Sequence, residues 1–279
     1  MRRRITTIFL VILLISGVGM IAYPWISNRV NASSHAHVIE NYQANVETMN
    51  EEEIQEEKEA AEQYDQSAVS SQMSDPFAEG EETNVVYEGS YSNILNVGET
   101  MGYLEIPAID VELPIFHGTS ELAMQEGVGH MEGTSMPVGG ESTHCVLASH
   151  SGLTDTKLFT ELDQLVVGDK FYLYVLDEVL TYQVDEINVV LPSDTSKLEV
   201  VPGKDYVTLL TCTPVGTNTH RLLVRGVRVR NETSEMDGRV SGNEISNQTI
   251  LSIIWWVIPL MAVGFAVLAV GIRRRKKRG

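Results

Sequence analysis

Residues 205–226 read DYVTLLTCTPVGTNTHRLLVRG and form the most informative part of the chain. β-Branched and aliphatic residues dominate Val207–Cys212 and again Arg221–Val229, which predicts two strands. The connection between them contains a proline and a glycine, and both residue types favour turns. If the strands pair antiparallel, Cys212 and Arg221 face each other about 5 Å apart. A thiol beside a permanent cation suits a nucleophile with an anion-stabilising partner.

The rest of the middle region is also predicted to be mainly β. Short apolar runs between turn signals predict strands at Tyr103–Ile109, Leu113–His117, Thr143–Ser149, Lys170–Leu176 and Leu180–Val190. Many short strands of this kind are typical of a closed or nearly closed barrel. One short amphipathic helix is predicted at Lys157–Leu165, where Leu158, Leu162 and Leu165 share a face.

Composition narrows the possible functions. The chain has 279 residues, with 38 acidic against 20 basic side chains and a formal net charge of −18. Nucleic-acid binding needs a basic face, so no nucleic-acid partner is predicted. Two cysteines are too few for a disulfide framework. A close pair such as C-x-x-C is missing from the sequence, so we predict no metal site and no other cofactor.

Both ends of the chain carry apolar stretches next to basic residues. Arg2–Arg4 precede Ile5–Ile26, which is long enough to cross a bilayer, since a span takes about 20 residues. A cleaved signal peptide is the alternative, but the run is long and no Ala-x-Ala site follows it. Ile250–Ile272 is followed directly by the basic tail RRRKKR. The positive-inside rule then places both basic ends in the cytoplasm and Ser27–Thr249 on the outer face.

Polar segments join these apolar stretches to the β region. Ser33–Gln66 is acidic and rich in Glu, Ala and Gln, which predicts a solvated helix that acts as a stalk away from the membrane. Gln66–Asn84 has no periodicity and contains Pro76 and Gly80, so a loop is predicted. Asn231–Thr249 is predicted to be a polar linker.

Cys212 and His150 are the main candidates for chemistry. A free cysteine is often only a small buried hydrophobe, but Cys212 stands where a strand gives way to a proline-containing loop. A thiol nucleophile needs an acid or base partner, and histidine is a common one. His150 ends the strand-like run HCVLASH. The competing histidines are His144, His117, His130 and His220.

Cys145 and Arg221 each have an alternative interpretation. On an outer surface, a Cys145–Cys212 disulfide is possible. Strand alternation argues against this disulfide. In an extended strand Cys145 and His150 point to opposite faces, so Cys145 points away from the site if His150 points into it. Arg221 could make only a weak surface ion pair. Its position opposite Cys212 favours instead a group that holds a substrate carbonyl or its oxyanion.

At this point the residues resemble those of the sortase family. TLLTC, which ends at Cys212, resembles the family's nucleophile strand TLxTC. HRLLVRG is similar to its arginine segment, and His150 in LASHSG falls where the family carries its histidine. The resemblance covers roughly Met101–Arg230. Ser149 and Ser151 replace the Gly and Arg of the commoner GHRG, which leaves the local loop contacts open.

Longer segments are similar to the class C, pilin-polymerising sortases. These segments are KLFTELDQLVVGDKFYLYVL and VPGKDYVTLLTCTPVGTNTHRLLVRG. Class C enzymes carry a lid with an Asp-Pro-aromatic tripeptide, and Asp75-Pro76-Phe77 stands in that place. They often have a C-terminal transmembrane segment, as expected here. The implied fold is a closed sortase-type β-barrel of about eight strands with short helices, an N-terminal helical and lid segment, and two transmembrane helices.

The resemblance also implies a reaction and its residues. Cys212 attacks the threonine carbonyl of an LPxTG-type sorting signal and forms a thioacyl enzyme. His150 protonates the leaving glycine amine and then deprotonates the incoming lysine, while Arg221 orients the peptide and stabilises the oxyanion. Thr211 is a possible supporting residue. In the implied lid, Asp75 pairs with Arg221 and Phe77 covers the sulfur. The partners are the membrane and pilin subunits that carry an LPxTG-type signal and a nucleophilic lysine.

The resulting map divides the chain into six parts. These are an anchor or signal (1–27), a helical stalk and lid loop (28–84), a catalytic barrel (85–230), a linker (231–249), a transmembrane helix (250–272) and a basic cytoplasmic tail (273–279). A housekeeping sortase that attaches proteins to peptidoglycan is the nearest alternative. A wall-anchored surface protein would need LPxTG just before the last apolar stretch, and 231–249 contains none. A non-catalytic adhesion module would tolerate loss of Cys212.

Overall fold

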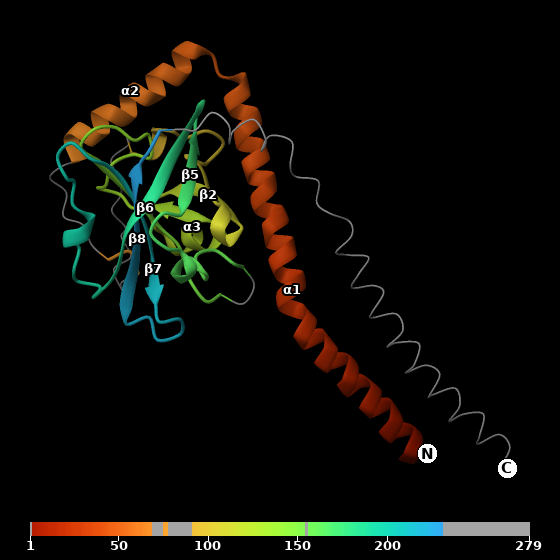
Figure 1. Ribbon diagram of the computed structural model, residues 1–279. Helices are drawn as coiled ribbons and strands as arrows, with labels where there is room; N and C mark the ends of the chain where they lie inside the picture. The colour runs from red at the N-terminus through yellow and green to blue at the C-terminus, as the bar shows by residue number, and fades with distance from the viewer. Residues whose placement is uncertain (1, 69–74, 78–90, 154–155, 231–279) are drawn as a thin grey trace. The chain divides into compact units, whose positions relative to one another are not determined.

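The computed structural model describes residues 2–68, 75–77, 91–153 and 156–230 (Figure 1). Compact units comprise Met1–Asn231 and Glu232–Gly279, and the second unit lies outside the described residues. The predicted linker and the predicted span Ile250–Ile272 therefore lie outside them too. Of the predicted loop Gln66–Asn84, residues 66–68 end a helix and 75–77 form a turn.

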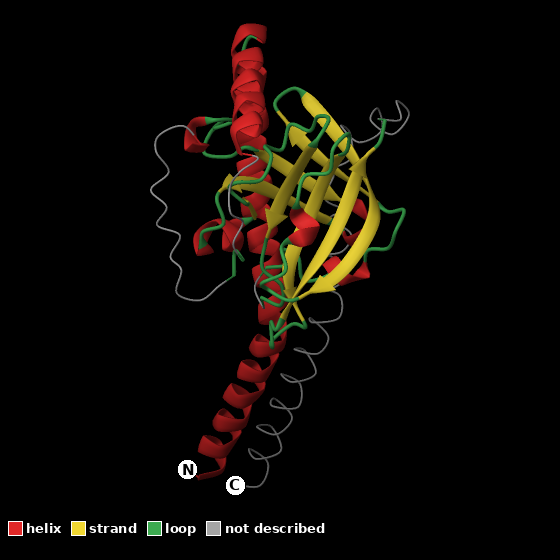
Figure 2. Cartoon of the chain, turned by 90° about the vertical axis from the view of Figure 1, so that its left-hand side faces the viewer, coloured by secondary structure: helices red, strands yellow, loops and turns green. Residues whose placement is uncertain are grey.

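Eight strands close into a barrel in the order β1-β2-β3-β4-β7-β8-β6-β5. Figure 2 shows them as a curved, wrapped sheet. The strands are β1 (Gly102–Ile106), β2 (Val111–His117), β3 (Val128–His130), β4 (Thr143–Ala148), β5 (Lys170–Val175), β6 (Glu178–Val190), β7 (Asp205–Thr213) and β8 (His220–Arg228). β2 with β3 and β4 with β7 pair parallel, and the other neighbours pair antiparallel. The predicted mainly β, closed-barrel fold is confirmed.

All seven predicted strands are present within a few residues of their expected limits, and β3 was missed. β3 has three residues and lies among glycines, which disfavour strands in sequence patterns. The glycine in its centre is needed for close packing, because a Cβ on Gly129 would lie 2.5 Å from the Gly118 carbonyl oxygen. The short helix α3 (Glu121–Glu126), just before β3, was also missed.

The helix predicted at Lys157–Leu165 is wrong. The structure has turns there and a single 3-10 helix, η3 (Leu162–Gln164). Leu158 has a φ of +37°, in the left-handed region, which is incompatible with a continuous α-helix. The shared leucine face nevertheless has a physical basis, because Leu158, Leu162 and Leu165 are all buried. The other 3-10 helices are η1 (Tyr91–Asn93), η2 (Pro107–Ile109) and η4 (Ser196–Leu198).

Strand alternation creates two apolar clusters on opposite faces of the sheet. The larger one has members from all eight strands and fills the barrel. The smaller one, here called the outer cluster, consists of Met124, Met131, Val146, Ala148, Leu198, Leu210 and Leu223. Leu147 and Leu209 belong to the inner cluster, whereas their neighbours Val146 and Leu210 belong to the outer one. The outer cluster forms the floor beneath the candidate site.

The predicted stalk is helical, but it is neither one helix nor fully solvated. It comprises the end of α1 (Arg2–Thr48) and all of α2 (Glu51–Ala68). Asn50 separates them as an N-cap, because its Oδ1 accepts from the amides of Glu52 at 2.9 Å and Glu53 at 3.0 Å. The Glu53 carboxylate accepts from the Asn50 amide in return, which completes a capping box.

Both helices pack against the barrel through apolar side chains, such as Ile39 and Ala61, and through hydrogen bonds. Tyr42 is 3 % exposed, and its hydroxyl accepts a hydrogen bond from the Leu176 amide at 2.7 Å. Near the end of α2, the Tyr64 hydroxyl accepts from the Gly133 amide at 3.0 Å. The neighbouring Asp65 carboxylate accepts from a main-chain amide at 2.7 Å. α2 is therefore docked on the barrel where the chain leaves towards Asp75.

Among the helices described here, none is both long enough and apolar enough to span a bilayer.

Candidate active site

β7 and β8 place Cys212 directly opposite Arg221 in antiparallel register, as the sequence predicts. The two strands lie side by side (Figure 1). Both residues continue the outer face, since Leu210 and Leu223 of the outer cluster are paired two positions away. Cys212 is 7 % exposed, and the Arg221 side chain is 8 % exposed. A thiol and a guanidinium therefore share one partly desolvated end of the sheet.

His150 follows β4, which runs parallel to β7 with Ala148 paired to Leu210. The Ser149 amide continues this pairing with a hydrogen bond of 3.2 Å to the Leu210 carbonyl. His150 thus leaves the sheet beside the end of β7 that carries Cys212. Thr211, the possible supporting residue, donates from Oγ1 to the Ser149 carbonyl at 2.7 Å. That bond ties the nucleophile strand to the residue just before the histidine.

The two serines that depart from GHRG make specific contacts. Ser149 Oγ donates to the carbonyls of Met124 at 3.2 Å and Gly127 at 2.6 Å, which fastens the end of β4 to the α3 region. Ser151 Oγ donates to the Cys212 carbonyl at 2.7 Å. The substitutions therefore add connections between the histidine loop, α3 and β7.

Asp75 makes a bidentate ion pair with Arg221. Arg221 Nε donates to Asp75 Oδ1 at 2.8 Å, and a terminal nitrogen donates to Oδ2 at 2.6 Å. The other terminal nitrogen donates to the carbonyls of Asn218 at 2.9 Å and His220 at 3.0 Å. Every guanidinium nitrogen thus has a partner, and a substrate oxygen could bind here only after Asp75 moves away.

Phe77, two residues after Asp75, packs over the same site. Its ring centroid lies 5.6 Å from the His150 ring centroid and 5.2 Å from Arg221 Cζ. It also packs against the outer cluster. The tripeptide therefore contacts two of the three predicted catalytic residues, and the expectation that Phe77 covers the sulfur stays a prediction.

The electrostatic surroundings keep the thiol protonated in this arrangement. Burial raises the pKa of Cys212, the Arg221 charge opposes that shift, and the Asp75 charge adds to it. For Arg221 itself, burial lowers the pKa, but its hydrogen bonds to Asp75 and the nearby negative charges outweigh burial and raise the pKa. The cation is retained, while its effect on the sulfur is partly cancelled by Asp75.

The competing histidines serve structural roles. His130 is fully buried, and its ring nitrogens contact the Tyr91 hydroxyl at 2.8 Å and the Ser135 carbonyl at 2.9 Å. Burial lowers the pKa of His130 to about 4. His117 Nε2 donates to a main-chain carbonyl at 2.7 Å. His220 is half-buried and contacts the neighbouring Thr219 hydroxyl at 2.9 Å.

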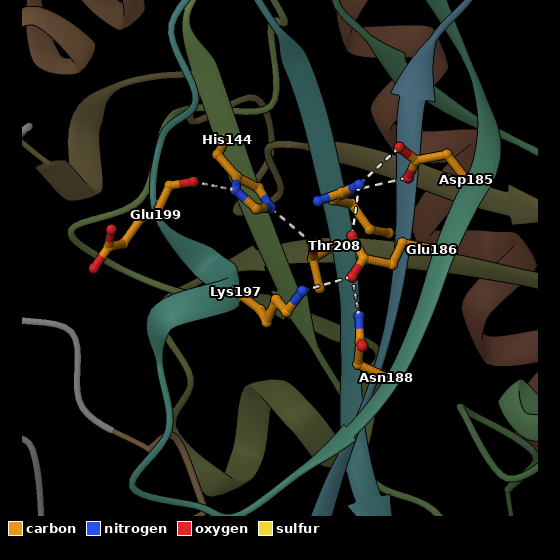
Figure 3. A network of polar contacts seen from close by, with 8 residues as sticks. His144, Asp185, Glu186, Asn188, Lys197, Glu199 and Thr208 are labelled. Atoms are coloured by element: carbon orange, nitrogen blue, oxygen red, sulfur yellow. Dashed lines mark hydrogen bonds and ion pairs between the residues drawn. The ribbon is translucent and has the colours of Figure 1, made fainter.

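His144 belongs to a polar network at the other end of the same outer face (Figure 3). Its Nδ1 donates to the Glu199 carbonyl at 2.9 Å, and its Nε2 accepts from Thr208 Oγ1 at 2.7 Å. Lys197 pairs with Glu186 of β6 at 2.7 Å. These contacts hold the β6–β7 connection over the outer cluster.

A small cavity of about 10 Å³ lies between this connection, the lid residues and β8. It is lined by Asp75, Pro76, Val190, Leu191, Pro192, Asp194, Thr195, Leu198, Leu210, Arg221 and Leu223. In this arrangement the cavity has room for about one water molecule, so a peptide could reach the Arg221 guanidinium from this side only after Asp75 and Pro76 move away.

Cys145 lies away from the site. It pairs with Val207, which is five residues before Cys212 and therefore about 16 Å from it along the strand. Both cysteines are free, and that separation is too large for a disulfide. Burial raises the pKa of Cys145, so it remains a thiol in the core. Within the described residues, no cluster of His, Cys, Asp or Glu could hold a metal ion.

Glu121 is a site residue that the sequence analysis missed. Its Oε2 lies 3.1 Å from His150 Nε2. It belongs to α3, which has six residues and no periodicity long enough to identify it. Only the contact in space reveals this carboxylate.

Comparison with known proteins agrees with this geometry. Residues 104–229 match the family model of the sortase domain. The chain is 33% identical over 127 residues to Sortase A of Streptococcus agalactiae, a match that covers 44% of this chain and 51% of that protein. It is 34% identical over 135 residues to Sortase D of Bacillus subtilis, covering 47% and 65%. The chain thus spans about half to two thirds of these curated relatives.

Solved structures match over a longer region. Sortase C of Streptococcus pneumoniae is 45% identical, with a TM-score of 0.64, over 70% of this chain and 97% of that one. Sortase C1 of the group B Streptococcus pilus island 1 is 42% identical, with a TM-score of 0.65, over 71% and 94%. The chain therefore belongs to the sortase family, and its structural neighbours are class C sortases.

Proposed function

We propose that this chain is a membrane-anchored cysteine transpeptidase that polymerises pilin subunits. The observation that carries the proposal is the register of β7 and β8, which sets Cys212 opposite Arg221. His150 arrives at the same end from β4. A nucleophile, an acid–base group and a permanent cation are the parts that acyl transfer requires.

In the proposed mechanism, His150 takes the proton of the Cys212 thiol, and the resulting thiolate attacks the threonine carbonyl of an LPxTG-type signal. The carbon–sulfur bond forms, and the negative charge that develops on the oxygen is stabilised by Arg221. His150 gives a proton to the glycine nitrogen as the Thr–Gly bond breaks. A lysine amine then attacks the thioester, loses its proton to His150 and expels the Cys212 sulfur. The product is an amide bond between the threonine and the lysine.

The lid opens before this chemistry, because Asp75 occupies the guanidinium that the oxyanion needs. Opening also removes the Asp75 charge that raises the pKa of Cys212, which favours the thiolate. Asp75-Pro76-Phe77 is thus proposed to hold the enzyme inactive until a sorting signal displaces it.

Pilin is the proposed substrate because the structural neighbours are class C sortases. A solved structure described as a pilus-related Sortase C of group B Streptococcus is 42% identical to this chain, with a TM-score of 0.65 over 96% of its length. The partners are pilins with an LPxTG-type signal and a nucleophilic lysine. Attachment of surface proteins to peptidoglycan remains the alternative, because curated relatives include Sortase A enzymes.

The proposed anchors come from the sequence. Ile5–Ile26 and Ile250–Ile272 are both long apolar runs next to basic residues. In the first run, Ile12, Leu13, Leu14 and Ile15 are each more than half exposed on α1. With these two runs as anchors, the catalytic barrel is proposed to lie on the outer face of a Gram-positive-type cell.

Deletion of the gene, followed by an immunoblot of cell-wall extracts, tests this function. We expect the high-molecular-weight pilin ladder to disappear and to return with the wild-type gene but not with Cys212→Ala. A ladder that persists, together with loss of monomeric surface proteins from the wall, would identify the housekeeping activity instead.

A further inference from the structure

The Glu121 carboxylate is held from two sides. Its Oε2 lies 3.1 Å from His150 Nε2, and its Oε1 accepts a hydrogen bond of 2.5 Å from Gln125 Nε2, one turn further along α3. A carboxylate can only accept, so Nε2 of the neutral imidazole carries the hydrogen. Nδ1 is then the nitrogen without a hydrogen, and it is the one that can take up a proton.

α3 is also fixed to the backbone next to His150. Ser149 Oγ bonds the Met124 and Gly127 carbonyls, and Met124 is buried in the outer cluster. The first turn of α3 is capped by Ser120 Oγ, which accepts from the Ala123 amide at 3.2 Å. The helix therefore contacts both the main chain before the histidine and the ring itself.

We propose that Glu121 is a positioning residue for the acid–base histidine. It holds the tautomer in which Nε2 keeps its hydrogen while Nδ1 exchanges protons. In the first half-reaction Nδ1 takes the proton of the Cys212 thiol and gives it to the leaving glycine amine. In the second, Nδ1 takes a proton from the lysine amine as the Cys212 thiolate leaves, and this proton returns to the sulfur. The Nε2 hydrogen stays on the ring throughout. This proposal rests on the proposed function, because it requires His150 to be the acid–base group.

Two other roles for Glu121 predict different effects on the two half-reactions. Its side chain is 67% exposed, so the contact could be a surface ion pair with little effect on stability or rate. The same exposed carboxylate could instead attract the ammonium group of the incoming lysine. Positioning affects both half-reactions, whereas lysine recruitment affects only the second.

The first test measures the tautomer without requiring activity. Full-length protein labelled with ¹⁵N-histidine is compared by NMR with Glu121→Ala, Glu121→Gln and the control Glu126→Ala, which changes an exposed glutamate on the same helix. We expect His150 to show the Nε2–H tautomer in the wild type, in Glu126→Ala and in Glu121→Gln, whose amide oxygen still accepts. A tautomer mixture is expected in Glu121→Ala. The same tautomer in Glu121→Ala as in the wild type would overturn the proposal.

The second test separates the half-reactions by rapid-quench kinetics with an LPxTG peptide. We expect Glu121→Ala to lower the rate of glycine-peptide release about tenfold, with KM for the peptide within about twofold and an unchanged Tm. Glu121→Gln should stay within about twofold of wild type. A normal rate of glycine-peptide release in Glu121→Ala, with a raised KM for the amine alone, would show that Glu121 recruits the lysine. A rate in Glu121→Gln as low as in Glu121→Ala would show an effect of charge. Either result overturns the positioning role. If the wild type formed no acyl enzyme, the proposed function would fail, and the tautomer measurement would still decide the role of Glu121.

Discussion

The Asp75 carboxylate bonds Arg221 through two parallel hydrogen bonds of 2.8 and 2.6 Å. A weak surface ion pair was one alternative for Arg221, but the pair that it makes with Asp75 does not lie at the surface. The two side chains are only 8% and 10% exposed. Such a pair is less screened by water than a surface pair, so its hydrogen bonds hold the lid more firmly. The cation that the reaction needs is the same group that fastens the lid.

Asp75→Ala should therefore expose Cys212. Losing on the order of 1–2 kcal/mol of lid-closing free energy should make alkylation of Cys212 by iodoacetamide about tenfold faster. Removing the Asp75 charge acts in the same direction, because that charge raises the pKa of the thiol. Labelling is followed by intact mass spectrometry, with Asp163→Ala, an exposed carboxylate, as the control. Equal rates for Asp75→Ala and the wild type would show that the tripeptide does not shield the sulfur.

Thr211→Val should impair both stability and turnover. The substitution keeps the shape of the side chain but leaves the buried Ser149 carbonyl without the 2.7 Å hydrogen bond from Thr211 Oγ1. We expect the free energy of unfolding in urea to fall by about 1 kcal/mol. Acylation should slow several-fold, because Ser149 precedes His150. Thr217→Val, in the exposed β7–β8 connection, is the control and should change neither quantity.

Asp65→Asn should stabilise the protein at alkaline pH. Burial, with a smaller contribution from the Glu62 charge, raises the pKa of Asp65 from 3.8 to about 7, although the Met136 amide opposes the shift. Because this pKa is raised on folding, the folded state binds more protons than the unfolded state between about pH 4 and pH 7. The ionised carboxylate is therefore destabilising above pH 7, and this cost disappears as the pH falls towards 4.

An asparagine oxygen can still accept from the Met136 amide without carrying a charge. We therefore expect Asp65→Asn to raise the free energy of unfolding by about 2 kcal/mol at pH 8, after allowance for partial exposure of the carboxylate, and by nearly nothing at pH 4. Urea unfolding at the two pH values measures the difference, and Glu62→Gln tests the smaller charge contribution. A gain that did not depend on pH would contradict the assignment.

The sequence was sufficient to predict that Cys212 and Arg221 lie opposite each other, because local rules of strand pairing determine their positions. A short hairpin connection fixes the register that places Cys212 opposite Arg221. The two-residue period of a strand predicts that Cys145 turns into the barrel, away from Cys212. The identity of the lid tripeptide came from family resemblance, since an Asp-Pro-Phe turn has no distinctive local pattern.

Contacts between distant segments could not be predicted. Glu121 and His150 are 29 residues apart in the chain, and they meet where Ser149 fastens the end of β4 to the region of α3. α2 looked like a solvated helix because its acidic sequence has few apolar residues. It is docked instead by a few apolar contacts, such as that of Ala61, and by hydrogen bonds of Tyr64 and Asp65 that no periodicity reveals.

Intact mass spectrometry of the full-length protein with an LPxTG peptide tests the central claim most directly. The wild type and the faster-opening Asp75→Ala variant should each gain the mass of the peptide up to its threonine, and added lysine amine should remove that mass as a new amide product. Cys212→Ala should gain no mass, while His150→Ala and Arg221→Ala should acylate at least a hundredfold more slowly. An adduct that still forms in Cys212→Ala, or full turnover in His150→Ala, would contradict the assigned roles.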